Sequence, residues 1–309
     1  MVYGARERIR DRVKLTPLIV SERLSELIGG EVFLKLENRQ VTGSFKARGA
    51  LNKVLQLSED EREKGLVAAS AGNHGQGMAW AAQQAGIKVT VVVPQNTPQI
   101  KIDAILAHGV ELMVEGRDYD EAEAIAKVFS RDHGRVFVSP YNDSDVIAGQ
   151  GTVGLEIMEQ WPQVDTVLVP VGGGGIISGI SLAMGEGVDV VGVQSSASPT
   201  MHESLRTGHI VDVELGPSIA EGLHGGLEVG AITFDIVNER VRDILLVNEE
   251  EIGKAVRSLH LMEGITVEGS AAVGPAAIRR YPGRFTRRKV AVVITGGNIE
   301  PELLARLLA

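Results

Sequence analysis

Short apolar runs rich in β-branched residues alternate along this chain with longer segments of helical periodicity. Runs such as 90–93 and 291–294 are apolar on both faces, as strands inside a parallel sheet must be. The alternation therefore predicts an α/β fold with parallel-rich twisted sheets covered by helices. The predicted strands are 32–36, 66–70, 88–94, 111–114, 135–139, 166–171, 188–194, 243–247 and 289–295. The predicted helices are 44–57, 73–85, 98–108, 119–131, 143–160, 176–184, 249–263 and 269–280.

The length of the chain, 309 residues, is enough for two lobes and too great for one small core. The segments between about 66 and 140 form a compact block of alternating strands and helices. No long linker, low-complexity stretch or fixed-period repeat divides the chain. We therefore expect two lobes with a cleft between them, and ligands at the carboxyl ends of the strands.

Composition and charge exclude several classes of function. The net charge of −9 disfavours a large nucleic-acid surface. No apolar run approaches the ~18 residues of a membrane span, and the first residues contain no apolar signal core. With no cysteine there is no disulfide and no cysteine-ligated metal, and we expect a cytoplasmic protein. The basic run at 279–289 is expected to be a solvated helix end and loop, with an anionic effector site as the alternative.

Lys46 lies in the segment TGSFKARGA (42–50), boxed in by small residues and one aromatic ring. We expect Ser44 to cap the helix, which places Lys46 in its first turn. A helix N-terminus disfavours a further positive charge and so helps to keep a nearby amine neutral and nucleophilic. Lysines that form imines with carbonyl cofactors need this property. Taken alone, an ordinary solvated lysine is the more common interpretation.

Two glycine-rich loops follow predicted strands and open predicted helices. In the first, Gly172–Gly175, consecutive N–H groups can converge on an anion. The dinucleotide fingerprint fails there because Ile177 or Ser178 stands where its last glycine belongs, so we expect a monophosphate site, with a structural turn as the alternative. In the second loop, 70–75, exposed N–H groups suit a carboxylate and Asn73 offers an amide donor. His74 is expected to be mainly structural, although it could act as a base.

The segment 295–298 ends the last predicted strand, where ligands of such sheets bind. The hydroxyl of Thr295 can donate to or accept from a ring nitrogen without forcing its protonation. On its own, this segment is equally consistent with ordinary turn chemistry.

Taken together and in this order, these motifs resemble the fold-type-II pyridoxal-phosphate enzymes. Within them the chain is similar to the serine/threonine dehydratase and serine racemase family. The resemblance runs from about residue 15 to 299 and rests on TGSFKARGA, SAGNHGQG, IAGQGT, VGGGG and ITGGN. It implies a two-lobed fold like that of the tryptophan synthase β chain. The large cofactor-binding domain would comprise 1–64 and 141–309, the small domain 65–140, and the cofactor would lie in the cleft between them.

The resemblance also implies a role for each residue at the site. Lys46 would carry pyridoxal 5'-phosphate as a Schiff base, Phe45 would pack beside its ring, and Asn73 would hydrogen-bond its 3-oxygen. Thr295 would face the pyridine nitrogen. The residues that would hold the phosphate are Gly172, Gly173, Gly174, Gly175 and Ile176; those lining the ring are Gly222 and Glu268; those taking the substrate carboxylate are Ser70, Ala71, Gly72, Asn73 and His74.

The chain departs from the sequences of the family that it resembles in three places. The racemases have a serine at the position of Ala71 that protonates the far face, and alanine has no proton to give. The carboxylates of the racemase-type divalent-ion site are replaced by Gln194 and Thr200, so we expect no metal there. The segment 219–228 also differs in wording, and His224 and Gly225 lie where substrate-facing residues are expected. This third departure leaves the preferred β-hydroxy amino acid open.

The resemblance predicts a lyase that eliminates water and ammonia from L-threonine, L-serine or both, giving 2-oxobutanoate or pyruvate, with Lys46 as the Cα base. The alternatives are a serine or hydroxyaspartate racemase/dehydratase and a dehydratase for a bulkier β-hydroxy amino acid. A β-replacement synthase is less favoured, since such enzymes usually have threonine where His74 stands. A non-enzymatic cofactor-binding or amino-acid-sensing protein would form no 2-oxo acid. We expect a homodimer or homotetramer, and no isoleucine feedback, because no C-terminal regulatory domain fits in the chain.

Overall fold

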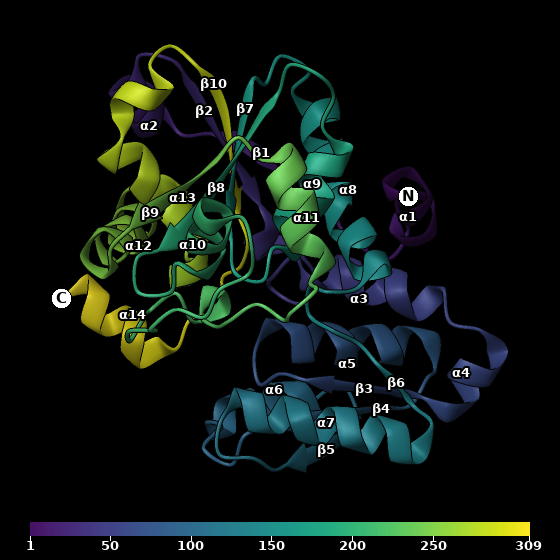
Figure 1. The fold of residues 1–309 in the computed structure, drawn as a ribbon. Coiled ribbons are helices and arrows are strands. Elements are labelled where there is room, and N and C mark those ends of the chain that lie inside the picture. The colour runs from purple at the N-terminus through teal and green to yellow at the C-terminus, as the bar shows by residue number, and fades with distance from the viewer.

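The computed structural model describes residues 1–309 and contains two sheets, each covered by helices on both faces (Figure 1). The larger sheet has the strand order β1-β2-β10-β7-β8-β9 and the smaller has the order β5-β4-β3-β6. Every neighbouring pair is parallel except β1 with β2. The strands are β1 Leu18–Val20, β2 Glu31–Leu36, β3 Leu66–Ala69, β4 Val89–Val93, β5 Glu111–Val114, β6 Val136–Phe137, β7 Thr166–Pro170, β8 Asp189–Ser195, β9 Asp243–Val247 and β10 Lys289–Ile294. The predicted parallel-rich α/β fold is confirmed.

The helices form the outer layers of the molecule, and none is long and apolar enough to cross a membrane. The α-helices are α1 Val2–Ile9, α2 Glu22–Ile28, α3 Lys46–Leu55, α4 Glu59–Lys64, α5 Asn73–Ala85, α6 Gln99–Leu106, α7 Tyr119–His133, α8 Ser144–Gln160, α9 Gly175–Ala183, α10 Thr200–Thr207, α11 Ile232–Arg240, α12 Glu249–Glu263, α13 Gly269–Arg280 and α14 Pro301–Leu308. Three short 3₁₀ helices are η1 Glu37–Arg39, η2 Glu221–Leu223 and η3 Pro282–Phe285.

The six-stranded sheet is buried on both faces, because its inner strands carry apolar side chains that point in both directions. Helices α2, α12 and α13 pack on one face, and α8, α9 and α11 contribute to the core on the other. Strand β10 lies between β2 and β7, with Val292 opposite both Leu34 and Leu168. This parallel register brings the carboxyl ends of the three strands, and the residues that follow them, to one edge of the sheet.

The four-stranded sheet has α7 on one face and α5 on the other (Figure 1). Helix α3 packs against α5 on one side and against α8 on the other, so it lies where the two sheet systems meet. Its buried residues Ala47, Leu51 and Val54 share one apolar core with Leu66 of β3 and Val146 of α8. The residue at the start of α3 is therefore held by both halves of the molecule.

Most predicted elements occur within one to three residues of their predicted ends, but the sequence interpretation missed β1 and six helices. Those helices, α1, α2, α4, α10, α11 and α14, have nine residues or fewer, too few turns for a clear period. The predicted N-cap at Ser44 is wrong. Phe45 precedes α3 and no side chain caps it, because Ser44 is buried and bridges Gly296 after β10.

Candidate active site

Lys46 is the first residue of α3, as the predicted first-turn position requires. Its amine donates to the carbonyl oxygen of Pro140 at 2.8 Å and lies 5.2 Å from the centre of the Phe45 ring. Burial lowers the pKa of Lys46 to about 8, and the nearby carboxylate of Glu268 only partly opposes this shift. An appreciable fraction of the amine is therefore neutral near physiological pH, as a nucleophile or base needs.

The start of α3 is held in place from behind by a buried network of charges. The guanidinium of Arg48 donates twice to Glu37, both at 2.8 Å, and twice to Glu156, at 2.6 and 2.9 Å. Glu156 also accepts from Lys35 at 2.6 Å. Burial opposes the ionisation of Glu37, but Arg48 outweighs it and holds the pKa of Glu37 below its ordinary value. The network ties α3 to β2, η1 and α8 and so fixes the backbone at the start of α3, where Lys46 lies.

The loop Gly172–Gly175 joins β7 to α9, as predicted, and Gly175 is the first residue of α9. Gly174 has φ +87°, which favours glycine. A Cβ atom on Gly173 would lie 2.3 Å from the ring of Tyr141, so this position also has no room for a side chain. None of the loop, turn or side-chain hydrogen bonds uses an N–H group of Gly172–Ile176 as donor. These free donors at a helix N-terminus fit an anion.

The loop after β3 carries Asn73 as the first residue of α5. The side-chain amide of Asn73 donates to both carboxylate oxygens of Glu268, at 2.9 and 3.0 Å. Ser70, Ala71 and Gly72 precede it and are each partly exposed, and the Ser70 hydroxyl accepts from the N–H of Gly72 at 3.2 Å. The loop therefore lies beside Glu268, a residue that belongs to the half of the molecule built on the six-stranded sheet.

His74 is buried one residue further along α5, and its Nε2 lies 3.1 Å from the carbonyl oxygen of Val138. Burial, reinforced by the Lys46 ammonium, lowers the pKa of His74 to about 3. The ring is therefore neutral at physiological pH and donates from Nε2 to Val138. This arrangement supports the structural interpretation of His74 more than the role of a base.

The end of β10 meets Glu268 and the start of α3. Thr295 is buried, its hydroxyl has no partner within the protein, and its carbonyl oxygen accepts from the N–H of Phe45 at 3.1 Å. Glu268 precedes α13, and burial raises its pKa to about 7. A Cβ atom on Gly222 would lie 3.9 Å from the Glu268 carboxylate, which places these two predicted ring-lining residues side by side.

The residues that the resemblance assigns to pyridoxal phosphate fit this cofactor chemically. The amine of Lys46 has a lowered pKa, as imine formation requires. The loop Gly172–Gly175 offers unused N–H groups for a phosphate, and the unpartnered hydroxyl of Thr295 can face a ring nitrogen. Close contacts between Lys46 and Pro140, and between Tyr141 and Gly173, connect these groups around one site.

Three residues of this site escaped the sequence interpretation, namely Pro140, Tyr141 and Asn298. Pro140 and Tyr141 follow β6, so their position at the end of a predicted strand was the available signal. The Tyr141 hydroxyl accepts from the N–H of Glu228 at 2.9 Å, which fixes the ring beside Gly173. Asn298 donates to Asn73 at 2.7 Å, a contact between distant segments that no local pattern reveals.

The side chains that replace the carboxylates of the racemase-type ion site form hydrogen bonds within the protein. Gln194 accepts from the N–H of His202 at 2.8 Å, and Thr200 donates to the carbonyl of Gly225 at 2.9 Å. His224 is exposed, and its ring lies 3.0 Å from the carbonyl oxygen of Gly216. The substrate-facing role of His224 and Gly225 stays a prediction.

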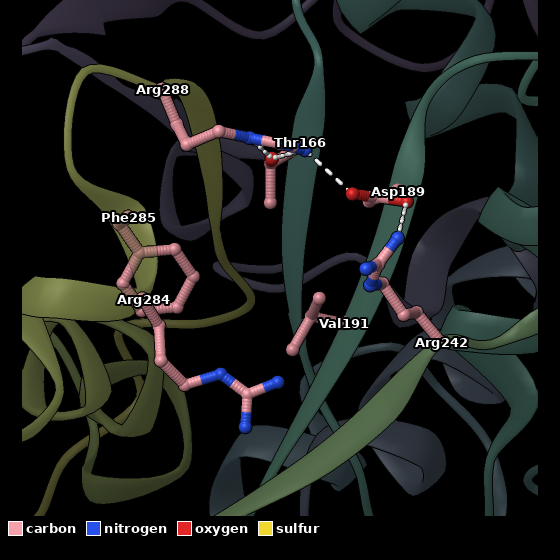
Figure 2. A pocket seen from close by; sticks show the side chains of 7 residues that line it. All are labelled: Thr166, Asp189, Val191, Arg242, Arg284, Phe285 and Arg288. Atoms are coloured by element: carbon pink, nitrogen blue, oxygen red, sulfur yellow. Dashed lines mark hydrogen bonds and ion pairs between the residues drawn. The ribbon is translucent and has the colours of Figure 1, made fainter.

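A separate cavity of about 200 Å³ lies at the amino ends of β7 and β8, the opposite end of the strands from the loop after β7 (Figure 2). Arg284 and Arg288 of the basic run line it, together with Arg242. Each guanidinium already pairs with an aspartate: Arg242 with Asp189, Arg284 with Asp243, and Arg288 with Asp165 and Asp189. The cavity therefore offers no unpaired cation to an anionic effector.

Comparison with known proteins gives concordant matches along nearly the whole chain. The family model described as pyridoxal-phosphate dependent enzyme matches residues 9–296. An L-threonine ammonia-lyase of Thermotoga maritima is 47% identical over 310 residues, covering 99% of this chain and 77% of that protein. The processed form of threonine deaminase isoform 2 from Solanum lycopersicum aligns with a TM-score of 0.93 and 32% identity, covering 99% of this chain and 87% of that one. Maize serine racemase aligns with a TM-score of 0.93 and 30% identity, covering 99% and 94%.

Proposed function

Because this chain belongs to the pyridoxal-phosphate-dependent enzyme family, we propose that it is an ammonia-lyase that dehydrates and deaminates L-threonine, L-serine or both. The products are 2-oxobutanoate from threonine or pyruvate from serine, each with ammonia, and the overall reaction consumes no net water. The observation that carries the proposal is the Lys46 amine, with its pKa lowered to about 8, together with the free N–H groups of the loop Gly172–Gly175. The adjacent residues Pro140 and Tyr141 contact Lys46 and Gly173 and so connect the two groups. Identity of 47% to an L-threonine ammonia-lyase supports the choice of substrate.

In this proposal the protein supplies the groups that hold the cofactor. Lys46 binds it covalently, the loop Gly172–Gly175 with Ile176 holds its phosphate, and Asn73 and Thr295 hydrogen-bond its ring. When bound, pyridoxal phosphate withdraws electrons from the α-carbon of the amino acid and so acidifies the Cα proton. Thr295 would present a neutral hydroxyl to the ring nitrogen, and a hydroxyl, unlike a carboxylate, does not hold that nitrogen in its protonated form.

The chain's own residues then orient the substrate and move the proton. The N–H groups of the loop 70–74, at the N-terminus of α5, bind the substrate carboxylate. Lys46 takes the Cα proton, because its lowered pKa leaves an appreciable fraction of the amine neutral near physiological pH. Neutral His74 holds the loop to Val138 from within the protein. The β-hydroxyl takes up a proton and leaves as water, and hydrolysis of the released enamine then consumes one water and frees ammonia.

A racemase-dehydratase is the second candidate, because maize serine racemase is 30% identical over nearly the whole chain. Racemisation needs a proton donor on the face opposite Lys46. Ala71 stands where the racemases have serine, and its methyl group packs with the apolar core beneath the four-stranded sheet. We therefore propose elimination over racemisation.

Initial rates of 2-oxo acid formation across four substrates test this function. The panel is L-threonine, L-serine, threo-3-hydroxyaspartate and phenylserine, each with the cofactor-loaded protein. We expect threonine or serine to give the largest kcat/KM. If both are inert while hydroxyaspartate or phenylserine reacts, the proposed substrate is wrong; if the protein binds cofactor but forms no 2-oxo acid from any of them, the proposed reaction is wrong.

We also propose that residues 65–140 form the small domain, with 1–64 and 141–309 as the large one. We propose a homodimer or homotetramer that works in the cytoplasm on a small β-hydroxy amino acid. Sedimentation of the purified protein tests the oligomer, and limited proteolysis of the loops near residues 65 and 140 tests the division.

A further inference from the structure

Asn298 follows β10 by four residues and joins three segments that are distant in the sequence. Its side-chain amide donates to the carbonyl oxygen of Thr42 at 2.9 Å, in the segment that leads to Lys46. The same amide donates to Oδ1 of Asn73 at 2.7 Å. Both of its hydrogens are therefore used, one on each side of the junction between the two sheet systems.

The two ends of the Asn73 carboxamide have different partners. Nδ2 donates to the Glu268 carboxylate at 2.9 and 3.0 Å, and Oδ1 accepts from Asn298 at 2.7 Å. A flip of this amide by 180° would turn Oδ1 toward the carboxylate and Nδ2 toward the amide nitrogen of Asn298. Both contacts would then be repulsive, because acceptor would face acceptor and donor would face donor. One orientation of Asn73 is therefore selected at both ends.

We propose that Asn298 is a positioning residue that fixes which end of the Asn73 carboxamide faces the cofactor. It acts through Asn73, which is the residue proposed to hydrogen-bond the ring oxygen. In the selected orientation the atom on the Glu268 side is Nδ2, a donor that contacts both carboxylate oxygens and would donate to the ring oxygen of a bound cofactor in place of one of them. In the flipped orientation an oxygen would take its place and repel the negatively charged ring oxygen.

Glu268 alone selects this orientation less strongly than it would if it were always ionised. It is buried, and burial raises its pKa to about 7. When protonated, its O–H can donate to Oδ1 of a flipped Asn73, so the carboxyl group then tolerates both orientations. The amide nitrogen of Asn298 is a donor in every protonation state of Glu268. Its contact with Asn73 therefore continues to favour the orientation described here.

The test uses the variants Asn298→Ala and Asn298→Asp, with Asn38→Ala as the matched control. Asn38 also donates to a backbone carbonyl, that of Thr266 at 3.1 Å, but no hydrogen bond joins it to Asn73. The measurements are the near-ultraviolet and visible spectrum of the bound cofactor, its dissociation constant from the reconstituted apoenzyme, and separate kcat and KM values. We expect both Asn298 variants to change the ratio of the cofactor's absorption bands and to weaken cofactor binding about three- to tenfold, as for the loss of one hydrogen bond.

Asn298→Asp should have at least as large an effect as Asn298→Ala, because its carboxylate oxygen would face the Oδ1 atom of Asn73. Asn298 is exposed, so both variants should fold, and thermal unfolding checks this. The proposal is overturned if both variants match Asn38→Ala in spectrum and dissociation constant, or if only the melting temperature falls. The inference rests on the cofactor site and not on the substrate, so a protein inactive toward threonine would refute the proposed function while the spectra still decide the role of Asn298.

Discussion

The substitution Arg48→Met tests whether the buried charge network behind Lys46 is held by its arginine. Arg48 is fully buried and is the partner of Glu37, which is also fully buried. In the variant Glu156 keeps Lys35 at 2.6 Å, whereas Glu37 keeps only the hydroxyl of Thr16. A buried carboxylate without a charged partner costs about 3–5 kcal/mol.

The size of the chain converts this cost into a measurable shift. With an unfolding entropy of about 2.1 cal/mol/K per residue, 309 residues give roughly 650 cal/mol/K, or about 1.5 °C per kcal/mol. We therefore expect the melting temperature of Arg48→Met to fall by about 5–8 °C at pH 7. The double variant Glu37→Gln with Arg48→Met should recover part of the loss, because a neutral amide needs no cation.

The loss should also depend on pH in a defined direction. Arg48 holds the pKa of Glu37 below its ordinary value, so this carboxylate stabilises the wild type above the ordinary pKa and the contribution is lost as the pH falls through the lowered pKa. Without Arg48, burial raises the pKa, so ionisation opposes folding. The difference between variant and wild type should therefore shrink as the pH falls from 7 toward 4.5. The control is Arg279→Met, an exposed arginine that donates to Ser258. The reasoning is refuted if Arg48→Met and this control have the same melting temperature. It is also refuted if the loss in melting temperature of Arg48→Met relative to wild type is independent of pH.

Three further predictions address the site. Gly173→Ala should weaken cofactor binding about fivefold or more in fluorescence titrations, since its Cβ would lie 2.3 Å from the Tyr141 ring and overpacking costs about 1–3 kcal/mol; unchanged affinity would contradict the tight loop. The rate of cofactor capture by the apoenzyme should rise with pH through about 8, because only the neutral Lys46 amine condenses with an aldehyde; a flat profile from pH 6 to 9 would refute the lowered pKa. Wild type should form little D-serine from L-serine in deuterated water, and Ala71→Ser should form more; abundant D-serine from wild type would show that this position does not limit the reaction.

Local patterns in the sequence predicted the elements that repeat a clear period or carry a special residue. The helix over 249–263 is an example, because Asn248 and Glu251 form a capping box and the buried residues recur at helical spacing. The glycine loop after β7 was predicted from its composition and its place between a strand and a helix. Short elements such as β1 and α2 have too few residues to repeat a period. Ser21 and Gly29 do cap α2, but the segment between them is too short to show helical periodicity.

Contacts between distant segments could not be predicted in this way. Ser44 looks like an N-cap in its local sequence, but its backbone bridges Gly296 and the helix begins two residues later. Asn298 meets Asn73 only because β10 and β3 end on facing sides of the junction between the sheets. The direction of the Lys46 pKa shift was predicted from the helix N-terminus, whereas the structure assigns it chiefly to burial.

The most direct test of the account compares 2-oxobutanoate and ammonia formation from L-threonine by wild type and Lys46→Ala, each incubated with the cofactor. Lys254→Ala serves as the control, because that lysine is exposed on α12 and pairs only with Glu250. We predict equal amounts of both products from wild type and the control, and a rate about 10²- to 10⁴-fold lower from Lys46→Ala. A wild-type protein that forms neither product, or a Lys46→Ala variant that forms them at the wild-type rate, would contradict the assignment of this site.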